Sequence, residues 1–335
     1  MLFELPEFEY FEPETLQEAL DILRDYGTNA KILGGGTDLL GLMKDRISGS
    51  QMPIPKALVN VKRIKELREI SHDAKESTVG SAVTLSEISS NSELRLRFPA
   101  FVQAAGVVAT TQIRNMGTLG GNLCQRPWCW YFRHPAFDCF KKGGKQCYAI
   151  TGDNSTYFSV YNLGTCVMSH PSDTAPALIS LGSMAKIASS SKGVRQIPLS
   201  EFFLGPKSVQ DNILLPDEVL VSVSVPKGSP KQRSIYLKQR IRDNWDFALA
   251  SVAACGSIDD QGRIETARIV LGGVAPMPFI LGTSEILEGK RLGEETKQEL
   301  ANLVKSKAKP LRMNRYKVRI VRALVLRALE SIFSA

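Results

Sequence analysis

Five of the six cysteines in this chain of 335 residues lie between residues 124 and 166. They come directly after a glycine pair, Gly120-Gly121, which stands between Thr118 and Asn122. Glycines allow a backbone to approach a ligand closely, and a cysteine cluster is suited to binding a metal. The combination predicts two redox-capable sites side by side, as expected of a protein that conducts electrons.

The spacing of the cysteines indicates which metal the loop would hold. The run Cys129-x9-Cys139-x7-Cys147-x18-Cys166 lacks the paired Cys-x2-Cys knuckles of a zinc ribbon and the compact run of a ferredoxin. Single cysteines on a long irregular loop can still surround an iron–sulfur cubane, in which each iron takes one outer thiolate. Structural zinc, and thiols that are unligated or form disulfides, remain as alternatives.

Two further observations bear on the cysteines. Cys255 lies in an apolar stretch and is expected to be a buried core thiol. Basic residues stand between the cysteines of the loop and suit a bound anionic cluster: Arg126, Arg133, Lys141, Lys142 and Lys145.

A second glycine-rich stretch lies near the N-terminus. The apolar run Ala30 to Leu33 is typical of a short buried strand, and it leads directly into Gly34-Gly35-Gly36-Thr37-Asp38-Leu39 and a new helix. Glycines before a helix expose backbone N–H groups to an anion, so this pattern predicts a phosphate site. No Gly-Lys-Ser/Thr follows, and Leu39 replaces the third glycine of the dinucleotide fingerprint. A tight turn without a ligand is the alternative.

The remaining sequence predicts an α+β chain of two domains. The Pro/Gly/Ser/Lys-rich stretch 226–232 marks a boundary between domains at 1–228 and 232–335, and the cysteine loop lies within the first. The second is expected to be an antiparallel sheet covered on one side. Helices are predicted at 14–27, from Thr84, at 99–111, 174–179, 294–306 and 317–333, with Asp173 as an N-cap; strands are predicted at 57–61, 78–83, 186–188, 219–225, 234–238, 248–258 and 266–274.

Charge and hydropathy exclude several classes of protein. The formal net charge is +8, and much of the excess lies in Lys305, Lys307, Lys309, Arg312, Arg315, Lys317, Arg319, Arg322 and Arg327. We expect a solvated basic helix there, with docking to an acidic subunit as the alternative. No nucleic-acid motif, membrane-spanning apolar run or signal peptide is present, so we expect no nucleic-acid partner, no membrane insertion and a cytoplasmic location, or a periplasmic one if a signal-bearing partner exports the assembly. No triad or carboxylate pair indicates a catalytic residue.

Three motifs in this order carry a family resemblance: Ile32 to Leu39, Gln112 to Asn122, and His170-Pro171-Ser172-Asp173. Together they resemble the FAD-binding medium subunit of the xanthine dehydrogenase / carbon monoxide dehydrogenase family of molybdenum hydroxylases. The resemblance covers nearly the whole chain. It implies a two-subdomain FAD-binding domain of the vanillyl-alcohol-oxidase type, followed by a small α+β domain with an antiparallel sheet.

The inserted run from Arg126 to Arg133 and the later cysteines narrow the resemblance. They are similar to the subclass with an extra [4Fe–4S] cluster, which includes the flavin subunits of bacterial aldehyde oxidoreductases and of 4-hydroxybenzoyl-CoA reductase. By that resemblance the cluster ligands are Cys129, Cys139, Cys147 and Cys166, and Cys124 is spare.

The resemblance also implies which residues contact FAD. Backbone N–H groups of Ile32, Leu33, Gly34, Gly35, Gly36, Thr37, Asp38 and Leu39 would surround the pyrophosphate. Thr118, Gly120, Gly121 and Asn122 would contact the second phosphate and the ribityl chain. Asp173 would contact the cofactor, and Thr110 and Thr111 would lie near the flavin. Lys238 would also lie near the flavin; the alternative is that it is an exposed strand lysine.

The function that this resemblance implies is electron transfer within a larger enzyme. The organic substrate would bind to a large subunit with the molybdenum cofactor, a small [2Fe–2S] subunit would relay electrons, and an external carrier would exchange them with FAD. Two alternatives remain: a stand-alone FAD-dependent oxidase or reductase, and a non-enzymatic zinc-binding scaffold with a basic docking surface.

Overall fold

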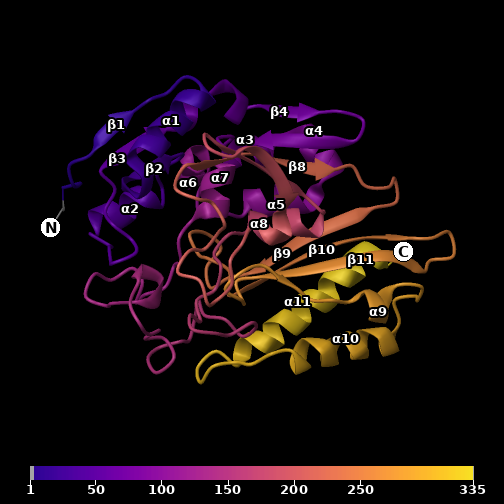
Figure 1. The fold of residues 1–335 in the computed structure, drawn as a ribbon. Helices are drawn as coiled ribbons and strands as arrows, with labels where there is room; N and C mark the ends of the chain where they lie inside the picture. The colour runs from indigo at the N-terminus through magenta and orange to yellow at the C-terminus, as the bar shows by residue number, and fades with distance from the viewer. Residues whose placement is uncertain (1–3, 335) are drawn as a thin grey trace.

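A computed structural model describes residues 4–334, which are built around three sheets (Figure 1). The first is parallel, in the order β1 (Glu9–Phe11), β3 (Ala57–Asn60), β2 (Ala30–Leu33). The second is antiparallel, in the order β4 (Ile70–His72), β5 (Glu76–Gly80), β8 (Glu218–Pro226), β6 (Met184–Ser189), β7 (Gly193–Pro198). The third is antiparallel too, in the order β12 (Phe279–Ile280), β11 (Ile264–Gly272), β10 (Ala250–Ile258), β9 (Arg233–Gln239).

Helices surround these sheets. Those of the first part of the chain are α1 (Leu16–Tyr26), α2 (Leu39–Lys44), α3 (Leu85–Ser90), α4 (Ser92–Arg97), α5 (Pro99–Gly106), α6 (Thr111–Met116), α7 (Leu119–Cys124) and α8 (Thr174–Ser180). Those of the last part are α9 (Ser284–Leu287), α10 (Glu294–Ser306) and α11 (Tyr316–Phe333). Within residues 4–334, no helix combines the length and apolarity that crossing a bilayer requires.

Local sequence signals account for several of these elements. The Thr15 hydroxyl accepts a hydrogen bond from the N–H of Glu18 and begins α1, which ends at Gly27 with φ of 53°. Thr84 and Glu87 form a reciprocal capping box at the start of α3. Helix α10 has the bounds predicted for it, 294–306, and the helix predicted at 317–333 corresponds to α11. The corresponding predictions are therefore confirmed.

Other predicted bounds are wrong for local reasons. The helix predicted at 99–111 ends at Gly106, Ala109 has φ of 42°, and a new helix, α6, begins after Thr110. The strand predicted at 78–83 ends at Gly80, where a Cβ would lie 2.2 Å from the carbonyl oxygen of Leu67. Strand β7 was not predicted, because its pattern is largely exposed.

The third sheet is covered on both faces, and not on one face as predicted. Helix α11 packs on one face, and α5 and α8 from the first part of the chain pack on the other (Figure 1). Small side chains form this second contact: Ala100 on α5, Ala177 on α8 and Ala253 on β10 share a buried cluster with Tyr236. Close packing of alanines joins the two parts of the chain into one body.

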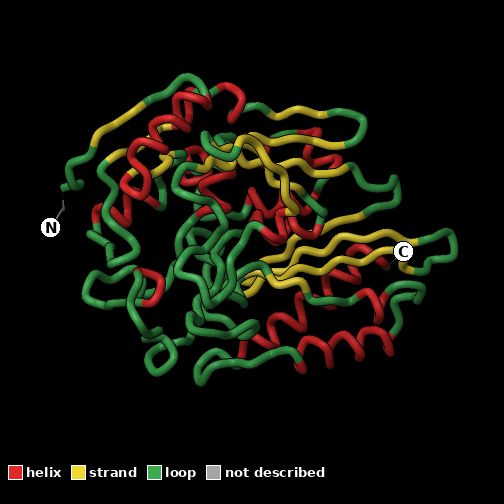
Figure 2. Tube along the Cα trace, in the orientation of Figure 1, coloured by secondary structure: helices red, strands yellow, loops and turns green. Residues whose placement is uncertain are grey.

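The cysteine loop runs from α7 to α8 and contains no strand, only a 3-10 turn at Phe140–Lys142 (Figure 2). It nevertheless has a core of its own, in which Cys129, Cys139 and Cys166 pack with Phe132 and Phe158. The segment before α11 and the first residue of that helix close over it: the N–H of Met313 donates to Asn154 Oδ1 (2.9 Å), and the Tyr316 hydroxyl donates to the Ser155 carbonyl (2.7 Å).

Lys317 contradicts the expectation that the basic C-terminal helix is wholly solvated. Its side chain is fully buried, and Nζ donates to the carbonyl oxygens of Thr156 (2.9 Å), Phe158 (2.8 Å) and Gly273 (2.7 Å). These three acceptors match the three N–H groups of an ammonium. Burial opposes the charge and lowers the pKa of Lys317 to about 7. The side chain joins α11, the cysteine loop and the end of β11.

The burial of Lys317 predicts a pH-dependent stability. Because its folded pKa is about 7 and an unfolded lysine titrates near pH ~10.4, the unfolded state binds more protons between these values. The free energy of unfolding should therefore rise with pH in this window, relative to Lys317→Met, by up to about 1.4 kcal/mol per pH unit. Urea unfolding of both proteins at pH 7, 8 and 9 measures this slope. Parallel curves would contradict a depressed pKa.

Candidate functional site

The two glycine-rich segments lie against each other. A Cβ on Gly35 would be 2.0 Å from the carbonyl oxygen of Met116, and one on Gly34 would be 2.7 Å from Thr118 Oγ1. No side chain fits at Gly35, because backbone atoms fill that space. The fold thus brings together two predicted motifs that are about eighty residues apart in the sequence.

The loop after β2 has free backbone donors. Among the described residues, no acceptor is within hydrogen-bond reach of the N–H groups of Gly35, Gly36, Thr37 and Asp38. These residues are partly or fully exposed. Consecutive unpaired N–H groups suit an anion, which is the ligand predicted for this loop.

The second glycine pair differs from the predicted ligand-binding turn. Gly120 and Gly121 belong to the first turn of α7, for which Thr118 is the N-cap. The N–H of Gly120 donates to the Ser81 carbonyl (2.8 Å), and that of Gly121 donates to Thr118 Oγ1 (3.1 Å). Both N–H groups therefore already have acceptors within the protein. A threonine before the glycines is also a suitable N-cap for a helix, which is the role that Thr118 has here.

Asp38 connects the first glycine loop to the cysteine loop. One carboxylate oxygen accepts from the N–H of Arg126 (2.9 Å), and the other pairs with the Arg133 guanidinium. Arg133 also donates to the Pro127 carbonyl (2.9 Å) and lies 4.6 Å from the centre of the Trp128 ring. The Asp38 side chain is therefore occupied, and only its backbone is free for a ligand.

Asn122 connects the second motif to the third. Its Oδ1 accepts hydrogen bonds from Ser172 Oγ (2.6 Å) and Thr174 Oγ1 (2.6 Å), and all three side chains are buried. Ser172 Oγ in turn accepts from the N–H of Ala175 (3.0 Å) and satisfies the first turn of α8. Asp173 stands at the N-cap position of α8, as predicted, but its side chain makes no capping hydrogen bond in the described structure.

The Asp173 carboxylate instead faces β9. It accepts from Lys238 Nζ (2.7 Å) and from the Tyr236 hydroxyl (2.6 Å), and the side chains of Asp173 and Lys238 and the whole of Tyr236 are almost fully buried. Lys238 is thus no exposed strand lysine. Burial, together with the adjacent carboxylate, raises the pKa of Tyr236 well above its ordinary value. Two of the predicted site residues, Asp173 and Lys238, form one buried ion pair.

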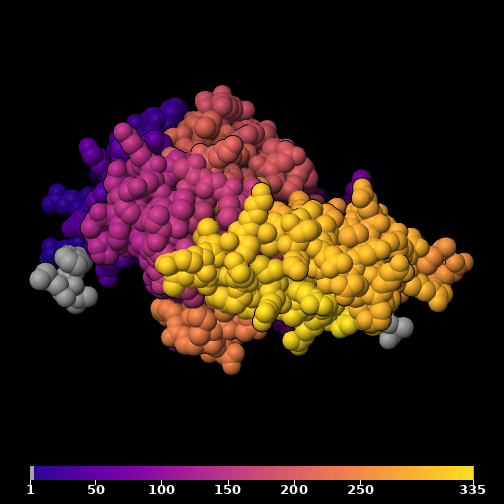
Figure 3. All heavy atoms as spheres, turned by 90° about the horizontal axis from the view of Figure 1, so that it is seen from below, coloured from indigo at the N-terminus to yellow at the C-terminus, as the bar shows by residue number. Residues whose placement is uncertain are grey.

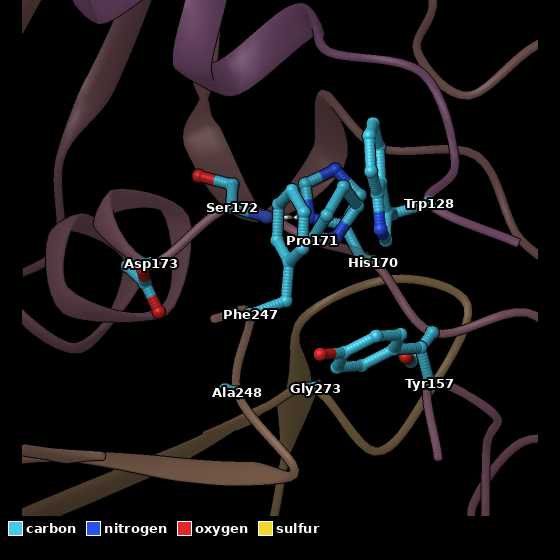
Figure 4. A pocket seen from close by; sticks show the side chains of 10 residues that line it. Trp128, Tyr157, His170, Pro171, Ser172, Asp173, Phe247, Ala248 and Gly273 are labelled. Carbon is cyan, nitrogen blue, oxygen red and sulfur yellow. Dashed lines mark hydrogen bonds between the residues drawn. The ribbon is translucent and has the colours of Figure 1, made fainter. Parts of the chain in front are cut away.

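A small cavity lies beside Asp173 (Figure 4). The rings of Trp128, Tyr157 and Phe247 surround it, with His170 at its wall. Trp128 and Phe247 have ring centres 5.2 Å apart. The cavity holds about 10 Å³, which is room for about one water molecule. A flat ring could enter only if these aromatic side chains moved.

His170, which lines this cavity, carries a buried donor without a partner among the described residues. Its Nδ1 accepts from the N–H of Ser172 (3.4 Å), so the proton of the neutral ring is on Nε2, which has no partner among the described residues. Burial lowers the pKa of His170 to about 4 and keeps the ring neutral. The two other predicted residues, Thr110 and Thr111, lie at the start of α6 and cap or bond within that helix.

Four of the loop cysteines share one environment. The core of the loop contains Cys129, Cys139, Cys147 and Cys166. The other two cysteines lie at the hydrophobic core between the second sheet and its helices: Cys124 packs against it, and Cys255 is buried in it, as predicted. All six thiols are free, so no disulfide forms. In the part of the chain that is described, no three His, Cys, Asp or Glu side chains are arranged around a single metal ion.

Backbone N–H groups point to these sulfurs. Burial raises the pKa of Cys129 to about 12, although the N–H groups of Phe132 and Tyr131 donate to it. A hydrogen bond from Cys166 lowers the pKa of Cys147 below that of a free thiol, and backbone donors lower it further. The charge of Cys147 in turn contributes to a raised pKa of Cys139, after burial itself. The thiols are close enough to influence one another's ionisation.

A buried charge network that the sequence did not predict lies beside these cysteines. The Asp211 carboxylate pairs with Lys141 Nζ (2.6 Å) and Arg126 Nη1 (2.8 Å), and Arg126 also donates to the Lys141 carbonyl (2.8 Å). Asp211 and Lys141 are nearly inaccessible to solvent. No local pattern around Asp211 could have indicated this role, because both partners are about seventy or more residues away.

Comparisons with known proteins agree on one family. The model for the FAD-binding domain in molybdopterin dehydrogenase matches residues 6–228, and that for the CO dehydrogenase flavoprotein C-terminal domain matches residues 235–332. The aldehyde oxidoreductase FAD-binding subunit PaoB of Escherichia coli K12 is 32% identical over 253 residues, which are 75% of this chain and 76% of the relative.

A second relative and two solved structures agree with these matches. The carbon monoxide dehydrogenase medium chain of Hydrogenophaga pseudoflava is 26% identical over 335 residues and 98% of each chain. The solved carbon monoxide dehydrogenase from that organism superposes with a TM-score of 0.78 at 25% identity, over 99% of both chains. Quinoline 2-oxidoreductase from Pseudomonas putida 86 gives 0.74 at 26% identity, over 98% of both.

The buried Asp173–Lys238 pair predicts strong non-additivity. Asp173→Asn should lower the free energy of unfolding by about 3 kcal/mol, because it leaves the Lys238 ammonium buried without a counter-charge. The double variant Asp173→Asn/Lys238→Met should cost less than the sum of the two single changes. Urea unfolding of the four proteins closes this cycle. Additive effects would mean that the two charges do not interact.

Proposed function

This chain belongs to the molybdenum hydroxylase family as an FAD-binding subunit, and we propose that it also carries a [4Fe–4S] cluster on the loop 124–166. It is an oxidoreductase subunit, and catalysis takes place in the molybdenum-containing partner. The stand-alone FAD oxidase or reductase and the zinc-binding scaffold are not favoured.

The residues after β2 fit the pyrophosphate of FAD. Glycine at position 35 lets the loop lie directly against Met116, and the N–H groups from Gly35 to Asp38 are free in the described structure. We propose that the backbone from Ile32 to Leu39 surrounds this dianion. FAD supplies two-electron exchange when bound, while the protein holds it and excludes competing reactions.

The remaining predicted FAD contacts are proposed with different roles. Gly120 holds α7 against Ser81 and Gly121 bonds the Thr118 cap, so we propose that they position Thr118 and Asn122 for the cofactor rather than donating their own N–H groups to it. Asp173, neutralised by Lys238, lines the aromatic cavity together with His170, whose Nε2 has no partner among the described residues. Thr110 and Thr111 position α6, whose last residue, Met116, supports Gly35.

The proposed cluster rests above all on one observation: four cysteines meet in one buried core, while the other two lie elsewhere. A cubane binds its four thiolates at four separate corners, so these sulfurs need not converge on a single ion. Hydrogen bonds from N–H groups to the sulfurs and the nearby cations Arg126 and Lys141 both suit an anionic cluster. We propose Cys129, Cys139, Cys147 and Cys166 as ligands.

The proposed enzyme contains further subunits. We propose a large molybdenum-cofactor subunit and a small [2Fe–2S] subunit as partners, with an external carrier at FAD. Two of the relatives, PaoB and the glyceraldehyde dehydrogenase medium chain of Sulfolobus acidocaldarius, are subunits of enzymes named for aldehydes, which favours an aldehyde as the substrate of the complex. We propose domains at 1–228 and 232–335. We propose the cytoplasm as the compartment, or the periplasm if a signal-bearing partner exports the complex.

Cysteine variants test the proposed cluster. Serine at Cys129, Cys139, Cys147 or Cys166 should lower the iron content from about four per chain to a small fraction of that value, because each iron needs one outer thiolate. Cys124→Ser and Cys255→Ser are matched controls and should keep their iron. Iron and acid-labile sulfide analysis, with EPR after reduction, measures this on anaerobically purified protein. Equal iron in all six variants, or FAD without iron in the wild type, would refute the cluster and leave the family unchanged.

Glycine variants test the FAD site. Gly35→Ala should lose most of its FAD, since the new Cβ would overlap the Met116 carbonyl and displace the loop. Gly41→Ala on α2 is the control, because a Cβ there meets nothing within 4 Å. Flavin absorbance per chain is the measurement, and circular dichroism shows whether both variants fold. Full flavin in a folded Gly35→Ala protein would contradict the assigned loop.

A further inference from the structure

A groove of about 640 Å³ runs between α10 and α11. Its floor is apolar and includes Ala301, Val304 and Val318. Its rim is basic, and the cations there are Lys305, Arg315, Arg319 and Arg322. These four cations belong to the basic segment 305–327 near the C-terminus. They are exposed, as predicted for a solvated helix, whereas Lys317 is buried.

The four rim cations lack counter-charges. In residues 4–334, none of them makes an ion pair, and no acidic side chain lines the groove. Other cations of the same two helices are paired: Lys297 contacts Glu330 (2.8 Å) and Glu294 (3.1 Å). Like charges along one groove repel one another, so an anion bound there would relieve that repulsion.

The groove opens next to the cysteine loop. The segment that joins α10 to α11 packs on that loop, where the N–H of Lys309 donates to the Val160 carbonyl (2.7 Å) and that of Met313 donates to Asn154. In Figure 3 the yellow C-terminal segment lies against the magenta loop. A chain that occupies the groove would therefore come close to the proposed cluster.

We propose that this groove docks an acidic segment of another protein subunit of the enzyme. Cations on the rim would pair with carboxylates, and the apolar floor would receive aliphatic side chains, as when an amphipathic segment binds in a groove. The apolar floor favours a peptide over a nucleotide or a phosphate. The inference rests on the chain's place in a multi-subunit enzyme and does not depend on the cluster.

Carbodiimide cross-linking of the purified complex tests this contact. This reagent joins an amine directly to a carboxylate, so it reports ion pairs. Lys305 should cross-link to an aspartate or glutamate of a partner subunit, and it should be acetylated at least fivefold more slowly in the complex than in the isolated chain. Equal acetylation in both, without a cross-link, would overturn the proposal.

Charge reversal supplies a second test. Arg319→Glu/Arg322→Glu should raise the dissociation constant of the assembly at least tenfold and reduce its dependence on salt. Arg327→Glu lies on the same helix outside the groove lining and is the control. FAD and iron contents, measured on each variant, should stay unchanged and separate this outcome from failure of the cofactor sites. Normal assembly of the double variant would overturn the proposal. The proposal would also be overturned if the double variant lost only its binding to inorganic polyphosphate or to phosphatidylserine vesicles and still assembled normally.

Discussion

The buried carbonyl groups of the cysteine loop impose the constraint on which the site depends. A loop without strands has no ladder to satisfy its backbone, so its C=O groups depend on turns and on side-chain donors. Basic side chains supply several of these donors: Arg126 to Lys141 (2.8 Å), Arg133 to Pro127 (2.9 Å), Lys142 to His134 (2.9 Å) and Lys317 to Phe158 (2.8 Å). The basic residues in and around the loop therefore hold its shape, and any effect of their charge on a bound cluster comes in addition.

The same cations connect the loop to the rest of the protein. Arg133 reaches Asp38 beside the first glycine loop, Arg126 and Lys141 reach Asp211, and Lys317 reaches across from α11. Each contact joins the loop to a different part of the fold. These links fix the position of the loop, and hence of the proposed cluster, relative to the first glycine loop.

Close packing of small residues brings together the two glycine segments and the third sheet. Gly35 lies directly against the backbone of Met116, and the alanines of α5, α8 and β10 allow the third sheet to pack on the first part of the chain. This packing places Lys238 of β9 against Asp173 at the start of α8. The aromatic cavity is consequently lined by residues from the cysteine loop, from the third motif and from the segment before β10.

The sequence by itself determined the elements and motifs that depend on neighbouring residues. Caps at Thr15 and Thr84, the amphipathic periodicity of α10 and α11, and the glycine loop after β2 all act over a few residues, so they were predictable. The order of three motifs was enough for the family. Only the tertiary structure decided which side chains meet: the ion pair of Asp173 with Lys238, the role of Asp211, and the burial of Lys317. These contacts join residues far apart in the chain, and their energies come from desolvation, which no local pattern encodes.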